Sequence, residues 1–155
     1  MRLKAILGSH DGEQSFVRRV LVATDRSETA GLAVAWAAEM AGRYEAELVV
    51  VRVFVPPMAP DAEAERDLVE YAHEVAGERG RAVLKVGEDP AKAIVEAADE
   101  VDADVLVVGN VGMSGRKEFL LGNVPNRVSH LTRRTLVIVN TAQRVEQRQK
   151  RRFGR

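Results

Sequence analysis

The sequence predicts one α/β domain, a doubly wound fold of three layers built on a five-stranded parallel sheet. Short apolar runs of strand length alternate with longer segments in which apolar residues recur every three or four positions, as in amphipathic helices. The apolar runs are continuous, which is typical of strands that helices cover on both faces. A length of 155 residues suits one such domain with a substantial core.

The elements follow in order from these patterns. The expected strands cover residues 20–23, 48–55, 81–86, 105–108 and 136–139. The expected helices cover residues 28–42, 61–79, 90–101 and 123–130. The second strand ends at Pro56, because proline cannot donate to a strand ladder. Strands that alternate with helices imply parallel pairing through right-handed crossovers.

Cap residues mark the expected helix ends. Ser27 can accept a hydrogen bond from the first turn of the first helix, and Asp89 can do the same before Pro90, which suits the first helical position. Gly80 is expected just beyond the second helix, where glycine readily takes the left-handed conformation. The inward face of the last helix is expected to carry Val124, Val128 and Leu131.

The composition excludes several classes of protein. Lys plus Arg and Asp plus Glu are both 23, so the formal charge is zero and gives no global argument for binding nucleic acid or membrane. The absence of cysteine excludes disulfides and thiolate chemistry. No apolar run approaches the ~20 residues that span a bilayer, and no long apolar segment near the start suggests a secretory signal. We therefore expect a cytoplasmic protein without membrane contact.

The two ends of the chain differ from the part between them. We assign residues 1–17 to a lead segment, 18–141 to the domain and 142–155 to a flexible tail. From Thr141 onward there are six basic residues and one acid, Glu146, so the rest of the chain is net acidic. The basic tail is either simply solvated or an arm that contacts an anionic or protein partner.

The candidate ligand site lies at the carboxyl ends of the first and fourth strands. Ligands of open α/β sheets bind beyond these ends, where the strand order reverses. The first strand ends at Thr24 and Asp25 and the fourth at Gly109, so we expect these residues to be neighbours. The Asp25 carboxylate could accept hydrogen bonds from a ribose or a base amine, or Asp25 or Ser27 could only cap the next helix.

A glycine-rich segment follows the fourth strand. Gly109 and Gly112 come directly after the apolar run, and Gly122 and Asn123 precede the last helix. Glycines let backbone N–H groups approach a ligand closely, and a helix start offers unpaired donors to an anion. The two clusters could therefore hold a phosphate chain; alternatively, the glycines only turn the loop.

Other functional patterns are missing from the sequence. There is no Walker A pattern, no G-x-G-x-x-G after the first strand and no G-x-S-x-G elbow. The three histidines, His10, His73 and His130, lack a second ligand at metal spacing. We therefore expect no catalytic residues and no metal site.

The chain resembles the universal stress protein family over residues 18–141. The resemblance rests on the segment from Val20 to Ser27, on the glycine pattern in residues 107–112 and 120–124, and on the closing strand at 137–139. The glycine spacing corresponds to the family's G-x2-G-x9-G-[ST]. The resemblance implies a sheet in the order 3-2-1-4-5, the adenine nucleotide alpha hydrolase-like arrangement, with ATP bound in members that keep the glycine pattern.

The same resemblance assigns nucleotide contacts by position. Contacts to the adenosine would come from Ala23, Thr24, Asp25 and, through its backbone, Val53. Contacts to the ribose and the phosphates would come from Val108, Gly109, Gly112, Gly122, Asn123 and Val124. Asn123 stands where the family has Ser or Thr, and Pro125 has no N–H. ADP and AMP therefore stay open beside ATP, which could carry Mg²⁺.

The function that the resemblance implies is that of an ATP-binding regulatory protein in stress response, with at most weak ATPase activity. Members of the family usually form homodimers, commonly through the last strand. That strand is Leu136 to Val139 here, and an exposed edge would invite pairing. The alternative is a dimeric adaptor that binds no nucleotide and acts through its dimer face and basic tail.

Overall fold

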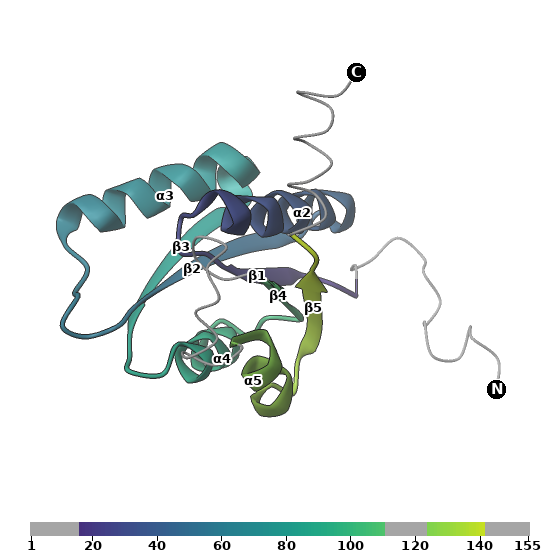
Figure 1. Cartoon of the computed structure of the whole chain (residues 1–155). Coiled ribbons are helices and arrows are strands. Elements are labelled where there is room, and N and C mark those ends of the chain that lie inside the picture. Colours follow the sequence, from purple (N-terminus) through teal and green to yellow (C-terminus); the bar gives the residue numbers. More distant parts are fainter. Residues whose placement is uncertain (1–15, 111–123, 142–155) are drawn as a thin grey trace, which may run out of the picture.

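The computed structural model describes residues 16–110 and 124–141. Within them, five parallel strands form one sheet in the expected order, β3-β2-β1-β4-β5 (Figure 1). The strands are β1 (Arg19–Ala23), β2 (Glu47–Phe54), β3 (Gly80–Val86), β4 (Val105–Gly109) and β5 (Thr135–Val139). The helices are α2 (Glu28–Tyr44), α3 (Ala62–Ala76), the 3₁₀ turn η1 (Gly77–Arg79), α4 (Pro90–Glu100) and α5 (Val124–Leu131). Most of the lead segment and the whole tail from residue 142 lie outside the description.

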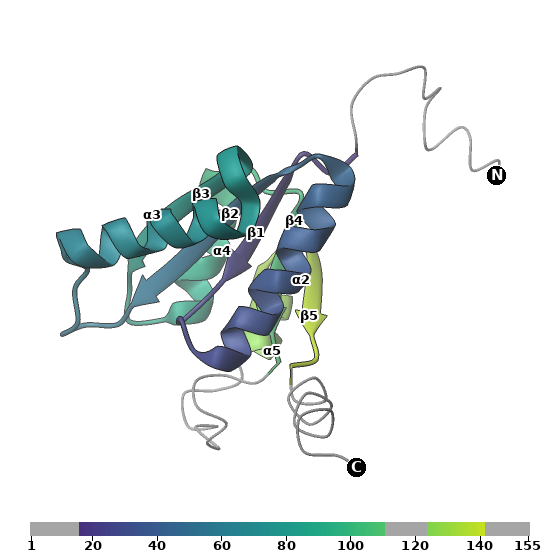
Figure 2. The same ribbon diagram turned by 90° about the horizontal axis from the view of Figure 1, so that it is seen from above.

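The helices cover both faces of the sheet and so produce the predicted three layers. α2 and α3 lie on one face, and α4 and α5 lie on the other (Figures 1 and 2). Val20 and Val22 of β1 pack in the core under α2 and α3, whereas Leu21 packs in the core under α4 and α5. All three side chains are fully buried, so the strand has no polar face. None of the helices in the described ranges is long and apolar enough to cross a bilayer.

Three of these helices begin at a side-chain cap. Ser27 Oγ accepts a hydrogen bond from the Ala30 N–H at 3.2 Å, and Asp89 Oδ1 accepts one from the Lys92 N–H at 3.4 Å. Both caps predicted from the sequence are therefore confirmed. Asp61 caps α3 in the same way. Each cap satisfies a backbone N–H that has no acceptor within its own helix, which is why helix starts can be predicted from local sequence.

The expectation that the second helix reaches residue 79 holds only if the 3₁₀ turn η1 is counted, and the expectation that Gly80 ends it in the left-handed conformation is wrong. α3 ends at Ala76, and the residue with a positive φ is Gly77, at 59°. Gly80 instead begins β3 and is buried. A Cβ at Gly80 would stand 2.0 Å from the carbonyl oxygen of Ala72, so this glycine permits the close approach of β3 to α3.

The last helix differs from expectation at its end. Val128 is fully buried and Val124 is half-buried, but Leu131 is 46% exposed. The prediction that Leu131 faces the core is therefore wrong. α5 has eight residues and Leu131 is the last of them. Helical periodicity gives the direction of a side chain, but it does not say how far along the helix the covering layer extends.

Candidate functional site

The ends of β1 and β4 lie side by side where the order of the strands reverses. β1 stands between β2 and β4, and Val22 of β1 pairs with Val107 of β4. The residues that follow, from Ala23 and Val108 onward, are therefore neighbours, as expected. From β1 the chain passes to α2 on one face, whereas α5, which precedes β5, lies on the other face (Figure 2). This is the arrangement beside which open α/β sheets bind ligands.

The turn after β1 is held by hydrogen bonds between side chains and backbone. Thr24 is buried; its N–H donates to the Val51 carbonyl at 2.9 Å, and its Oγ1 accepts from the Arg26 N–H at 3.0 Å. Asp25 Oδ1 accepts from the Ser27 N–H at 2.8 Å. The sequence left open whether Asp25 or Ser27 caps the first helix. In the structure Ser27 caps α2, and Asp25 shapes the turn before it.

Asp25 has one carboxylate oxygen without a donor among residues 16–110 and 124–141. Its Oδ1 makes the turn bond to Ser27, and no described group donates to its Oδ2. The side chain is half-buried at the carboxyl edge of the sheet. An anionic oxygen in this position can accept hydrogen bonds from a ribose hydroxyl or a base amine.

The backbone of Val53 faces the space beyond the end of β1. The Val51 carbonyl accepts from the Thr24 N–H and so points toward β1. Residues two apart on a strand direct their peptide groups to the same side, so the N–H and carbonyl of Val53 also point that way. The Phe54 carbonyl points oppositely, because it accepts from the Gly87 N–H after β3. β1 ends opposite Val51, which leaves the Val53 peptide groups beside the turn.

The other predicted contact residues divide into two groups. Ala23, Val53 and Val124 are half-buried against one core, the core under α4 and α5, and Val108 is buried. Gly109 is the last residue of β4 and pairs with Val139. The remaining predicted residues lie outside the described ranges; they are Gly112, Gly122 and Asn123. The structure thus describes all the predicted contact residues except these three of the glycine-rich segment.

The sequence interpretation missed Arg26 and Tyr71. Arg26 follows Asp25 with a φ of 67°, and its guanidinium carbon lies 3.7 Å from the centroid of the Tyr71 ring on α3. Burial raises the pKa of the Tyr71 hydroxyl, and the Arg26 charge partly opposes that rise. Tyr71 lies three residues after the buried Leu68, so helical spacing could have placed it inward; nothing local pointed to Arg26.

Asn110 was also missed, and it holds the start of the glycine-rich segment. Its N–H donates to the Val139 carbonyl at 3.0 Å. Its Oδ1 accepts from both the N–H and the Oγ1 of Thr141, at 3.0 and 3.1 Å, and Thr141 is fully buried. The residue after Gly109 is therefore tied to the end of β5, a contact between positions 31 residues apart that no local pattern reveals.

An ion pair joins α4 to α5 on the same face as Val53. Arg127 donates to both carboxylate oxygens of Asp89, at 2.7 and 2.6 Å. The hydrogen bonds from Arg127 hold the pKa of Asp89 below its usual value. Asp89 thus caps α4 and also anchors the first half of α5. No three carboxylate or histidine side chains in the described ranges lie close enough to hold a metal ion.

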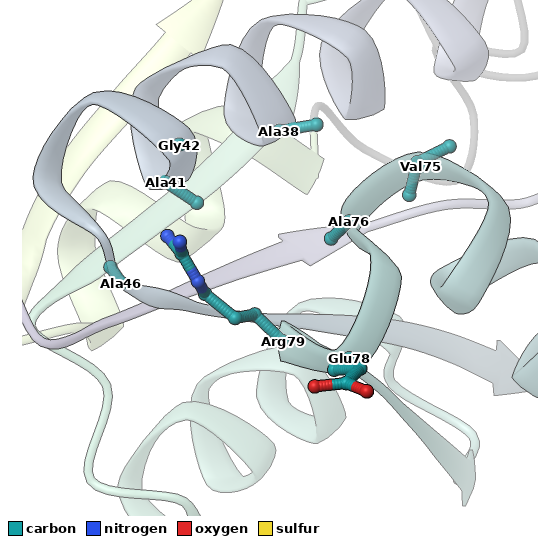
Figure 3. Close-up of a pocket in the computed structure, with 8 residues that line it drawn as sticks. All are labelled: Ala38, Ala41, Gly42, Ala46, Val75, Ala76, Glu78 and Arg79. Atoms are coloured by element: carbon teal, nitrogen blue, oxygen red, sulfur yellow. The ribbon is translucent and has the colours of Figure 1, made fainter.

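A hollow of about 520 Å³ lies elsewhere, between the carboxyl-terminal ends of α2 and α3 (Figure 3). Four alanines form half of its lining, and the Arg79 side chain extends across it toward Ala41 (Figure 3). It adjoins Gly80, where β3 begins, and so lies at the amino ends of the strands. We place the candidate site at the opposite edge, because the switch point and the polar turn are there.

The comparisons with known proteins agree with this arrangement. The model of the universal stress protein family matches residues 17–140. The chain belongs to the universal stress protein family. Universal stress protein Rv1636 of Mycobacterium tuberculosis is 34% identical over 146 residues, which cover 82% of this chain and 99% of that protein. Universal stress protein YxiE of Bacillus subtilis is 30% identical over 144 residues, which cover 78% and 97% of the two chains.

A solved universal stress protein provides the structural comparison. It is 36% identical to this chain, with a TM-score of 0.67, and the match covers 83% of this chain and all of the other. That protein was crystallised in complex with cAMP. The fold of this universal stress protein is accordingly the adenine nucleotide alpha hydrolase-like fold, as the sequence resemblance implied.

Proposed function

We propose that the protein binds an adenine nucleotide at the carboxyl ends of β1 and β4 and acts as a regulatory protein in stress response. The observation that carries the proposal is the turn after β1, in which the second Asp25 oxygen is left for a ligand beside the buried Thr24. A site at a switch point is also where this class of sheet binds ligands.

The adenosine is assigned to the part of the site that the structure describes. Asp25 would accept hydrogen bonds from the ribose or the base, and the Val53 peptide groups, which point into the space beyond β1, would pair with the edge of adenine. Ala23, half-buried on the core under α4 and α5, would supply an apolar contact. A flat base needs such a combination of backbone groups and apolar walls.

The phosphates are assigned to the glycine-rich segment. Val108 and Gly109 would lie near the ribose and the first phosphate. The outer phosphates would be contacted by Gly112, Gly122, Asn123 and Val124. Asn110 supports this proposal because it fixes the start of the segment against β5. ATP, with or without Mg²⁺, is the first candidate; ADP and AMP are alternatives. The relative crystallised with cAMP adds the cyclic nucleotide to the set to be tested.

Nucleotide occupancy would act on a homodimer. β5 is an edge strand, and Ile138 on it is 46% exposed. Pairing of two β5 strands across a two-fold axis would cover this edge. In this proposal the nucleotide changes which surfaces the dimer offers to a protein partner, and hydrolysis is not required. A dimeric adaptor with an empty site is the competing function.

Calorimetric titration of the purified protein with ATP, ADP, AMP and cAMP tests the proposal. We expect at least one nucleotide to bind. Gly122→Asp should weaken binding of the phosphorylated ligands, because a carboxylate would repel the phosphates. If no nucleotide binds, or if the variant binds all of them as well as the parent, the site assignment is wrong and the adaptor function is favoured.

A further inference from the structure

Arg26 has a backbone conformation that is uncommon for a residue with a Cβ. Its φ of 67° lies in the left-handed region that favours glycine. It stands directly after Asp25 and directly before Ser27, which caps α2. A non-glycine residue keeps such a conformation only where surrounding contacts hold it.

The contact that holds the Arg26 side chain comes from α3. The guanidinium carbon lies 3.7 Å from the Tyr71 ring centroid, well within the range of a cation–π interaction. In the described part of the chain, no carboxylate lies within ion-pair distance of Arg26. The partner of this cation is therefore the Tyr71 side chain, through its ring face and its hydroxyl, and the interaction links the turn after β1 to a different helix.

Tyr71 is itself fixed by the fold. Its ring is half-buried against the core under α2 and α3. Its hydroxyl lies close to the first turn of α2, since a Cβ added at Gly31 would stand 3.9 Å from it. Burial and the nearby Glu74 raise the pKa of the hydroxyl, and Arg26 lowers it, so the ring is neutral at ordinary pH. A neutral, anchored ring is a stable platform for a guanidinium.

We propose that Tyr71 is a positioning residue for the nucleotide site and that it acts through Arg26. The ring holds the guanidinium, and the Arg26 N–H keeps its bond to Thr24 Oγ1. Asp25, between the two, then keeps one orientation, with Oδ1 on the Ser27 N–H and Oδ2 left for the ligand. The inference rests on the proposed function, because it concerns the affinity of that site.

AMP is the probe for this inference, since it tests the adenosine end of the site. Tyr71→Leu removes the aromatic face and should weaken AMP binding by about fivefold, which corresponds to a typical cation–π interaction. Tyr71→Phe keeps the face and should bind within about twofold of the parent. Amide hydrogen exchange at Arg26 and Ser27 should accelerate in the Leu variant alone. A merely structural role would instead accelerate exchange throughout α3 and the sheet.

The outcomes separate this inference from the proposed function. If the parent binds AMP and Tyr71→Leu binds it with the same affinity as Tyr71→Phe, only the inference is overturned, because the aromatic face then makes no difference. If the parent binds no adenine nucleotide, the proposed function fails and the inference fails with it. Should Tyr71→Leu not fold, Arg26→Asn replaces it, because asparagine tolerates the left-handed conformation without a guanidinium. That variant should show the same loss of affinity, and unchanged affinity would overturn the inference.

Discussion

The two oxygens of Asp25 have different surroundings, although they belong to one carboxylate. Oδ1 accepts the Ser27 N–H at 2.8 Å and shapes the turn, whereas Oδ2 receives no bond from the described residues. A single substitution can therefore separate the structural role of this residue from its proposed ligand role. Asparagine keeps an oxygen for the turn and replaces the other oxygen by an amide group.

Asp25→Asn should weaken binding of the preferred adenine nucleotide by about tenfold to a hundredfold. A hydrogen bond to a charged acceptor contributes roughly 1.5–3 kcal/mol, and the amide group cannot accept one. The urea midpoint of unfolding should stay close to that of the parent, because the turn bond remains. Isothermal titration and denaturation curves measure the two quantities. Asp67→Asn, on the exposed side of α3, is the control. If the parent, Asp25→Asn and Asp67→Asn bind the nucleotide with equal affinity, Asp25 is not part of the site.

At the scale of elements, the fold depends on how closely α3 approaches β3 and on how α4 is joined to α5. Gly80 has no room for a side chain beneath Ala72. Asp89 serves as the cap of α4 and as the partner of Arg127. The capping role of Asp89 could be predicted from the chain, whereas its pairing with a residue 38 positions away could not.

Gly80→Ala should destabilise the protein by about 2 kcal/mol or more. The new Cβ would meet the Ala72 backbone at 2.0 Å, and a backbone clash in a packed core is relieved only by moving an element. Gly42→Ala is the matched control, because nothing lies within 4 Å of a Cβ there. It should stabilise α2 by roughly 0.5–1 kcal/mol. Urea unfolding measures both; equal destabilisation by the two substitutions would contradict the packing argument.

Arg127→Gln should lower the Tm at neutral pH, and the difference from the parent should disappear in acid. The folded-state pKa of Asp89 lies below its ordinary value of 3.8, chiefly because of the bonds from Arg127. The stabilisation is therefore present above about pH 3.8 and is lost as the pH falls through the lowered pKa. Thermal unfolding of the parent and of Arg127→Gln, from neutral pH to below about pH 3.8, measures this difference in Tm. Arg66 is an exposed arginine of α3, and Arg66→Gln should show no pH-dependent difference in Tm from the parent. If the Tm difference for Arg127→Gln does not change with pH, its ion pair with Asp89 is not the cause.

At the scale of the whole molecule, the sheet has two edges with different surroundings. β3 is one edge and β5 is the other. β5 pairs with β4 on one side only, and it carries the half-buried Leu136 and Val137 next to the exposed Ile138. Exposed apolar edge strands tend to pair with another strand. The proposed nucleotide site, at the carboxyl ends of β1 and β4, is separate from this edge in the strand order.

Ile138→Lys should convert the proposed dimer into a monomer. A lysine on an edge strand opposes strand pairing, because its charge would have to be desolvated in the interface. Sedimentation velocity measures the change. Val69→Lys, at a similarly exposed valine on α3, should leave the dimer intact. A monomeric parent, or a dimer that survives Ile138→Lys, would exclude this interface.

Local sequence was sufficient for the elements of this protein. Continuous apolar runs predicted β1 and β4 because both faces of a central strand are covered, and Ser27 and Asp89 predicted helix starts because a cap bonds within its own turn. The same reasoning failed for Gly80 and Leu131. Their surroundings depend on where another element stops, which no periodicity within one segment records.

Tertiary structure alone decided which side chains meet around the candidate site. Tyr71 reaches Arg26 from another helix, and Thr141 reaches Asn110 from the end of another strand. Burial patterns and cap residues act over a few positions of the chain, so the sequence by itself determines which segments are strands and which are helices. The alternation of the two along the chain predicts the three layers. Contacts between distant positions arise only once the sheet brings strand ends together. Two of them join the turn that carries Asp25 to other elements: the Thr24 N–H donates to the Val51 carbonyl, and Arg26 lies on the Tyr71 ring.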